Sequence, residues 1–311
     1  GKDGWVAVYA AQRTVEAADG HPEAPLIVGK LHAGWIADAQ FVSHSGIGEQ
    51  VFLLTAANDA TVALWDCKRA SVRDGRPQKA FHLTTLHSDG VFSLHEQGRK
   101  ILSASKDTSV AVTAMGDGAA TADAVMERRY LNLHNHVVKC ARWAAARHDA
   151  TVFASVGNTG EVQIADTRLP DDAAVASIST PQGGQLHSVV WHPDHEYTLA
   201  TTGRSPHVNV YDLRQGAGSG SVVHSLSGHC GPSVTKCARI YRPAFVQGGD
   251  GSVALAVSGY QSRKIVIFDL ATANIVSKGD IGYDALNMVW SSETKSLLTA
   301  RGRQVERFVP V

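Results

Sequence analysis

Short segments in which apolar and polar residues alternate recur along the whole chain, and turns rich in Gly, Asn, Asp and Ser separate them. In the clearest example, the apolar segment VFLLTAA (51–57) is followed by the turn Asn58-Asp59 and by the alternating segment TVALWD (61–66). A period of two predicts strands with one buried face, and a continuous apolar run of this length is typical of a strand buried on both faces. The pattern therefore predicts an all-β protein built from short strands.

The segment NDATVALWD (58–66) has weaker copies throughout the sequence. These copies align Trp65 with Tyr9, Thr113, Ala165, Tyr211, Phe268 and Phe308. The spacing between successive copies ranges from 40 residues (Phe268 to Phe308) to 57 residues (Tyr211 to Phe268). Repeats of roughly 40–50 residues made of short strands are the signature of a β-propeller. We therefore predict a single β-propeller domain over residues 1–311.

Six repeat units each show three strands, and an incomplete unit precedes them. After the partial unit at 1–31, the approximate ranges are 32–79, 80–125, 126–179, 180–226, 227–278 and 279–311. In the unit at 227–278, we expect VTKCARI (234–240) to be the first strand and RPAFVQGGDG (242–251) to be a loop. We favour seven blades, of which the first is incomplete at the N-terminus. The alternative is six blades, with the N-terminal strand completing the C-terminal blade.

Charge and cysteine usage narrow the classes of partner and compartment. The 29 Lys and Arg residues balance 29 Asp and Glu residues, so the basic excess typical of a nucleic-acid-binding protein is absent. No apolar run reaches the ~18 residues of a membrane helix, and no signal peptide is visible. None of the four cysteines forms a Cys-x-x-Cys pair, and Cys140 and Cys237 are expected to be small buried residues. We therefore expect an intracellular protein in a reducing compartment, the cytoplasm or the nucleus, that does not insert into membranes.

Three features of the repeats resemble the WD-repeat (β-transducin-like) family. Gly228-His229 matches the Gly-His pair that precedes the first strand, and Asp59 matches the aspartate of the turn before the third strand. Trp65-Asp66 matches the Trp-Asp end, and Tyr211-Asp212 and Phe268-Asp269 are aromatic variants of it. The features recur in phase over essentially the whole chain. The resemblance implies a β-propeller that takes part in protein–protein interactions.

The resemblance also implies a buried hydrogen-bond relay in the unit that ends at Trp65. In the family, a histidine donates to the turn aspartate, a strand hydroxyl joins, and the tryptophan N–H ends the relay. The matching residues are His32, Asp59, Thr55 and Trp65. A buried polar group without a partner costs about 1–3 kcal/mol, so this relay is expected to be structural. Thr113 and Ala165 replace the tryptophan in two other units, which we expect to rely on apolar packing.

No arrangement of residues in the sequence predicts catalysis or a bound metal. His134 and His136 are two residues apart and His192 and His195 three apart, but both pairs lie at positions with structural explanations and have no partner at a ligand spacing. The nucleophile-elbow, zinc-protease and phosphate-loop motifs do not occur. We therefore expect neither an enzyme nor a cofactor, and no small-molecule substrate. An enzyme with a site in the central channel is kept as a third hypothesis.

The loops before the first and third strands of each propeller unit open onto one face around the central channel. Residues in these loops need not support the fold, and in this chain they include Trp35, Lys106, Arg204, Tyr260 and Arg301. Exposed Trp, Tyr and Arg residues dominate interaction hot spots. We therefore predict a non-catalytic interaction scaffold or adaptor subunit of a larger assembly, which binds one or more proteins or peptide segments at this face.

Two strand ends support an alternative function. VYDLR (210–214) looks like the aromatic-Asp-x-Arg box by which some WD-repeat proteins dock on the adaptor of cullin-RING ubiquitin ligases. The resemblance implies Asp212 and Arg214 as docking residues. Asp166 and Arg168 form a second copy, in which Ala165 departs from the pattern. On this hypothesis the protein is a substrate receptor of such a ligase.

Overall fold

The regular secondary structure of the described residues is almost entirely β-strand. The computed structural model describes residues 3–8, 27–44, 50–67, 78–116, 124–147, 149–170, 172–181, 183–216, 221–248, 250–301 and 304–310. Within these residues, the one helical segment is the 3-10 turn η1 (Leu213–Gln215). The expected all-β class is thereby confirmed.

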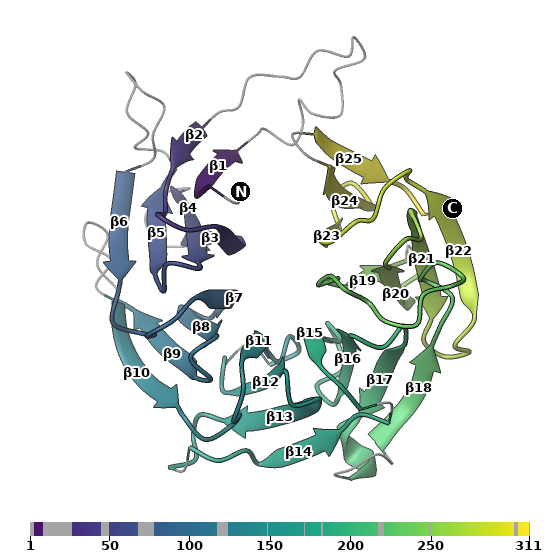
Figure 1. Ribbon diagram of the computed structural model, residues 1–311, viewed down its shortest axis with the longest axis horizontal. Helices are drawn as coiled ribbons and strands as arrows, with labels where there is room; N and C mark the ends of the chain where they lie inside the picture. The colour runs from purple at the N-terminus through teal and green to yellow at the C-terminus, as the bar shows by residue number, and fades with distance from the viewer. Residues whose placement is uncertain are drawn as a thin grey trace. The chain divides into compact units, whose positions relative to one another are not determined.

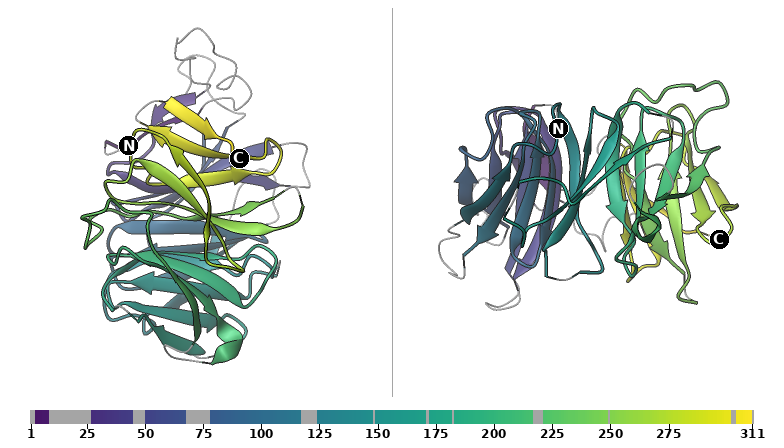
Figure 2. Two further views of the ribbon diagram at one scale, coloured as in Figure 1. Left: turned by 90° about the vertical axis from the view of Figure 1, so that its right-hand side faces the viewer. Right: turned by 90° about the horizontal axis from the view of Figure 1, so that it is seen from below.

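The chain forms two compact units, and each is described by itself. Unit 1 comprises Gly1–Trp143, His148–Ser155 and Asp166–Ala174, whereas unit 2 comprises Ala144–Arg147, Val156–Ala165 and Val175–Val311. Figure 1 labels the strands of both units, and Figure 2 shows the same strands from two further sides.

Unit 1 consists mainly of antiparallel sheets whose strands follow one another in chain order. β1 (Trp5–Val8) pairs with β2 (Ile27–Lys30). The next sheet contains β3 (Ile36–His44), β4 (Gln50–Ala57), β5 (Val62–Asp66) and β6 (Gln78–Leu83). It is followed by the sheet of β7 (Val91–Gln97), β8 (Lys100–Ser105), β9 (Val110–Met115) and β10 (Ala124–Tyr130).

A further four-stranded sheet has residues in both units, and three sheets follow it in unit 2. The shared sheet contains β11 (Val138–Trp143), β12 (Val152–Gly157), β13 (Glu161–Asp166) and β14 (Ala176–Ser179). Next come β15 (Leu186–Trp191), β16 (Thr198–Gly203), β17 (Val208–Asp212) and β18 (Val222–Leu226). The last two sheets contain β19 (Ala244–Gln247), β20 (Val253–Ser258), β21 (Lys264–Asp269) and β22 (Ile275–Asp280), and then β23 (Met288–Ser291), β24 (Ser296–Arg301) and β25 (Gln304–Phe308).

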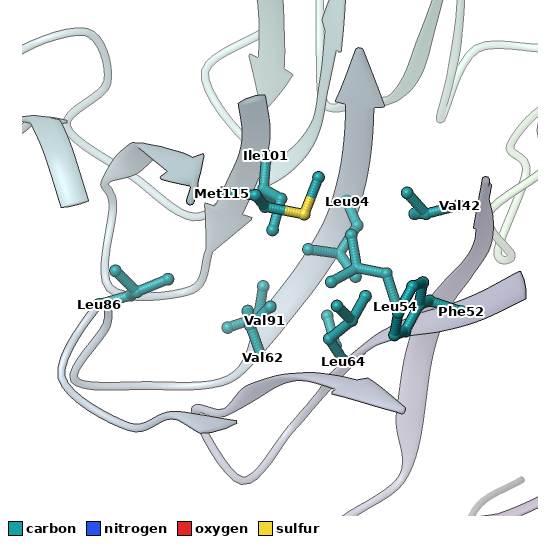
Figure 3. Close-up of a cluster of buried hydrophobic side chains, with 11 residues drawn as sticks. Val42, Phe52, Leu54, Val62, Leu64, Leu86, Val91, Leu94, Ile101 and Met115 are labelled. Carbon is teal, nitrogen blue, oxygen red and sulfur yellow. The ribbon is translucent and has the colours of Figure 1, made fainter. Parts of the chain in front are cut away.

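The core of unit 1 lies between neighbouring sheets. The apolar runs predicted at residues 51–57 and 61–66 form the central strands β4 and β5, in which Leu54 and Leu64 pair and are fully buried. Figure 3 shows their side chains converging with Val91, Leu94 and Ile101 of the next sheet. Each central strand is therefore covered on both faces, which explains its continuous apolar sequence.

Among the described residues, six sheets have three or four strands, and they are blades of the β-propeller type. The favoured interpretation of seven blades is therefore wrong, and the alternative count of six agrees with the structure. Residues 5–8 and 27–30 alternate like the last two strands of a blade, and in the described part of the chain they form a two-stranded sheet. That alternative also had the N-terminal strand completing the C-terminal blade, whereas in the described part of the chain β2 pairs with β1, and β25 pairs with β24.

One strand was predicted in the wrong place. VTKCARI (234–240) is not a strand, and the first strand of its blade is β19, which lies within the segment interpreted as a loop. β19 pairs residue for residue with β20, from Ala244 opposite Ala256 to Gln247 opposite Val253. Both segments alternate, so the pattern alone could not distinguish them. Cys237 and Tyr241 are buried, but their backbone is irregular rather than part of a strand.

Candidate functional site

A directed chain of hydrogen bonds runs through the blade of Trp65. The Trp65 Nε1 donates to Thr55 Oγ1 (2.8 Å), and the Thr55 hydroxyl lies 2.7 Å from His32 Nε2. His32 Nδ1 is 2.9 Å from Thr61 Oγ1, whose hydroxyl donates to Asp59 (2.6 Å). Because Asp59 can only accept when ionised, His32 donates through Nδ1 and accepts through Nε2. Thr61 was not included in the predicted relay and stands between the histidine and the aspartate, whose direct separation is 3.4 Å.

The relay fixes the loop that precedes β3. The Asp59 carboxylate also accepts from the backbone N–H groups of Ala33 (2.8 Å) and Gly34 (3.4 Å). Burial acts to raise the pKa of Asp59, but the hydrogen bonds from Thr61 and Ala33 and the nearby His32 outweigh it, so the pKa is lowered. The Asp59 carboxylate is therefore ionised, and its hydrogen bonds hold the loop that leads to Trp35.

The next blade retains the relay without tryptophan. His87 lies 2.8 Å from Ser103 Oγ and 3.0 Å from Ser109 Oγ, and Ser109 donates to Asp107 (2.6 Å). Arg129 also donates to Asp107 (2.7 Å). The expectation that this blade relies on apolar packing alone is therefore wrong: loss of the aromatic residue shortens the relay rather than removing it.

Trp35 lies in an aromatic and cationic cluster of unit 1. Its side chain is 37% exposed, and its ring centroid is 5.8 Å from that of Phe92. The Lys139 ammonium lies 4.4 Å from the centre of the Phe92 ring, within the range of a cation–π contact. Burial and the nearby Lys106 lower the pKa of Lys139, and Lys106 forms an ion pair with Asp89 (3.0 Å). These five residues are called the Trp35 cluster below.

Hydrogen bonds lock the loops that carry the cluster. Asn58 N–H donates to Trp35 O and Lys106 N–H to Gly90 O, each at 2.9 Å. Gly90 packs so closely on Asn58 that a Cβ atom would lie 2.5 Å from the Asn58 Oδ1. Phe92 is the extra residue at a register shift between Val91 and Ser93 in β7. Bulges of this kind re-aim side chains at functional sites.

The structure brings Trp35 and Lys106 of the predicted set together in unit 1, and sequence reasoning missed their neighbours Phe92 and Lys139. Both occupy the second position of a first strand, in VFSLH and VKCARW. A lysine inside an otherwise largely apolar inner strand was the signal that could have identified this position.

Arg204 and Tyr260 lie on two loops of unit 2, and the segment 231–237 forms backbone hydrogen bonds with both loops. Cys237 N–H donates to Arg204 O (2.7 Å), and Gly231 N–H donates to Tyr260 O (2.9 Å). The Arg204 side chain is exposed and that of Tyr260 is partly exposed. Arg301 is the last residue of β24, opposite Gln304, but its side chain lies outside the described residues.

The two Asp-x-Arg strand ends adopt one geometry. Arg214 Nη2 lies 2.6 Å from Asp212 Oδ2, and Arg168 Nη2 lies 2.6 Å from Asp166 Oδ2. Both arginines are exposed, at 67% and 58% of the side chain, and both also donate through Nε to their own aspartate. The departure at Ala165 therefore does not alter the local ion pair.

Asp212 also borders a pocket of about 520 Å³ in unit 2. Its polar walls include His192, His195 and His224. The rings of His192 and His195 stack at 4.1 Å, and His192 Nδ1 accepts from two backbone N–H groups of its own turn. Burial lowers the pKa of His192 to about 4, so this histidine is neutral at physiological pH. The pair thus shapes the turn between β15 and β16.

No model of a known protein family matches the chain, and no curated protein matches it either. Among the described residues, no helix has the length and apolar character needed to cross a membrane.

Proposed function

We propose that the protein is a non-catalytic β-propeller of the WD-repeat type that acts as an interaction scaffold or adaptor in a larger assembly. The observation that carries this proposal is the Trp35 cluster, in which an exposed tryptophan is held against Phe92 and Lys139. The His–Asp relays of two consecutive blades, with Trp65 ending the first, support the WD-repeat type.

Rigid presentation of the cluster is what makes it suited to binding. A tryptophan that is already fixed loses little side-chain entropy when a partner covers it, and such preorganisation raises affinity. Tryptophan is also enriched among the few residues that supply most of the binding energy of an interface. Contacts with Asp59, Asn58 and Gly90 fix the loop that exposes Trp35. The conformational entropy of this loop is therefore lost on folding and not again on binding.

The charges of the cluster indicate the chemistry of the partner. The ammonium of Lys139 is partly buried, and its positive charge is disfavoured by desolvation and by the nearby Lys106. Lys106 is already paired with Asp89, so a carboxylate placed beside the Lys139 ammonium would supply the counter-charge that Lys139 lacks and favour its charged form. The partner segment that fits best therefore carries an acidic residue beside an apolar one. Arg204 and Tyr260 provide a second patch for contact in unit 2.

The experiment compares the proteins captured from cells by the wild-type chain and by Trp35→Ala, at native abundance and with quantitative mass spectrometry. Phe41→Ala is the matched control, because Phe41 is an aromatic residue of β3 that is 55% exposed and lies about 20 Å along the strand from Trp35. We expect Trp35→Ala to lose the main partner while Phe41→Ala retains it, with unchanged melting temperatures. Equal capture by both variants would exclude the cluster as the binding site.

The alternative of a cullin-RING substrate receptor is favoured by the shared geometry of the two Asp-x-Arg pairs. Each pair holds its arginine at the surface with the guanidinium already oriented. On this alternative, the ligase adaptor co-purifies with wild type and with Arg239→Ala, an exposed arginine outside the motif, but not with Arg214→Ala. Adaptor recovery with Arg214→Ala at the wild-type yield would exclude Arg214 as a docking residue.

A further inference from the structure

Two thiols meet in the segment between β18 and β19 of unit 2. Cys230 Sγ and Cys237 Sγ are 3.4 Å apart, and neither residue is in a disulfide. Cys237 is buried, whereas Cys230 is partly exposed. By contrast, Cys67 Sγ contacts a backbone carbonyl and Cys140 Sγ contacts the hydroxyl of Ser93.

The contact is suited to forming a thiolate. The hydrogen bond from Cys230 lowers the pKa of Cys237, and the same shared proton, followed by burial, raises the pKa of Cys230. The Cys230 thiol thus keeps its proton, which it donates to the sulfur of Cys237. The Cys237 thiol loses its own proton more readily than an isolated thiol does. The thiolate is the nucleophilic form of cysteine. The partly exposed Cys230 gives a small oxidant access to the pair.

The pair also lies between the two loops of the second patch. Cys237 N–H donates to Arg204 O (2.7 Å), and Gly231 N–H donates to Tyr260 O (2.9 Å). Cys230 Sγ packs against Gly259 so closely that a Cβ atom on this glycine would lie 2.7 Å from the sulfur. A displacement of either sulfur is therefore expected to shift the backbone segments that carry Arg204 and Tyr260.

We propose that Cys230 and Cys237 form a redox modification site, at which a peroxide converts the thiol pair into a disulfide and thereby rearranges the loops of Arg204 and Tyr260. The chemistry of the pair stands independently of the proposed scaffold function, whereas its effect on partner binding rests on that function.

The reaction balances with hydrogen peroxide as the oxidant. A thiolate of the pair attacks one peroxide oxygen, the O–O bond breaks, and the sulfur becomes a sulfenic acid as hydroxide leaves. The second sulfur then attacks the sulfenic sulfur, the S–S bond forms, and the S–O bond breaks with release of water. Two sulfurs are oxidised by one electron each, and the two peroxide oxygens are reduced to water.

Disulfide formation must move the segment. The two sulfurs have to approach from 3.4 Å to about 2.05 Å, the length of an S–S bond. Because Cys230 is wedged against Gly259, this approach displaces residues 229–231 relative to Tyr260 or pulls Cys237 away from Arg204. At least one of the two backbone hydrogen bonds is therefore expected to weaken.

The experiment treats the purified full chain with hydrogen peroxide and follows intact mass, peptide maps and amide hydrogen exchange. We expect the mass to fall by about 2 Da through loss of two hydrogens, with the cross-link between the peptides of Cys230 and Cys237. Amides in 229–241 should exchange roughly five- to tenfold faster, as expected for loss of one backbone hydrogen bond. Cys67→Ser is the matched control and should still form the cross-link, whereas Cys230→Ser should not. Cys230 is partly exposed, so this variant is expected to fold.

Each failure has a distinct meaning. If the wild type keeps four reactive thiols under peroxide, or if Cys230→Ser loses two hydrogens as readily, the proposed modification site is wrong. If the disulfide forms but exchange in 229–241 and around Tyr260 is unchanged, its effect on the loops is wrong. If oxidation changes exchange but the double variant Arg204→Ala/Tyr260→Ala captures the same partners as wild type, the modification site stands and the binding role of this patch fails.

Discussion

Replacing Thr55 with valine tests how much the hydrogen-bond relay of Trp65, Thr55 and His32 contributes to the free energy of unfolding. Thr55 is fully buried, and its hydroxyl accepts from Trp65 Nε1 (2.8 Å) and lies 2.7 Å from His32 Nε2. Valine has nearly the same shape but no hydroxyl, so Trp65 and His32 each lose a buried partner. Each unsatisfied group costs about 1–3 kcal/mol, and we expect Thr55→Val to lower the free energy of unfolding by about 2–4 kcal/mol.

A conservative variant and a double-mutant cycle separate the hydrogen bonds from packing. Thr55→Ser keeps the hydroxyl and removes one methyl group, which should cost about 1 kcal/mol. Trp65→Phe removes the N–H that Thr55 accepts, so Thr55→Val should cost less in that background, with a coupling energy of about 1 kcal/mol. Urea unfolding at neutral pH gives the free energies when the variants share one denaturant slope. A Thr55→Val midpoint equal to that of wild type, or additivity of the two changes, would refute the directed relay.

Three further predictions concern pH, packing and charge. Burial lowers the pKa of His134 and of His229 to about 4, so the folded state binds a proton at each histidine less well than the unfolded state does. The free energy of unfolding therefore falls as the pH falls from 6.5 toward 4. His134→Gln should reduce the slope of the unfolding free energy against pH in this range by about 1.4 kcal/mol per pH unit. Leu54→Ala should cost about 2–5 kcal/mol in urea unfolding, whereas Val125→Ala, at a residue 64% exposed, should change stability by less than about 0.5 kcal/mol. Lys139→Met keeps the apolar stem of the side chain and should weaken partner capture at low salt more than at high salt; a loss independent of ionic strength would refute the carboxylate contact.

Much of the fold could be predicted because local sequence and global packing agree. The strands β4 and β5 follow from a continuous apolar run and a turn of Asn58 and Asp59, since both strands are covered on two faces. Blade number could not be predicted in this way. Residues 5–8 have the alternation of a third strand, and alternation does not report how many strands pair in one sheet.

The candidate sites depend on contacts between segments far apart in the chain. Trp35 and Lys106 could be predicted from loop positions, but Phe92 and Lys139 join them through packing between β7 and β11, which no single repeat encodes. The Cys230–Cys237 contact was hidden because VTKCARI was interpreted as a strand, in which Cys237 would have been a core residue. Bends in that segment bring its sulfur to Cys230 instead.

Site-specific photo-crosslinking in intact cells tests the scaffold role of the Trp35 cluster most directly. A photoreactive phenylalanine analogue is placed at position 35 and, as the control, at position 41 of the same blade. A partner at the cluster predicts a discrete covalent product from position 35 that is absent from position 41 and has a lower yield with Lys139→Met. Products of equal yield from both positions, or none from position 35, would contradict the account.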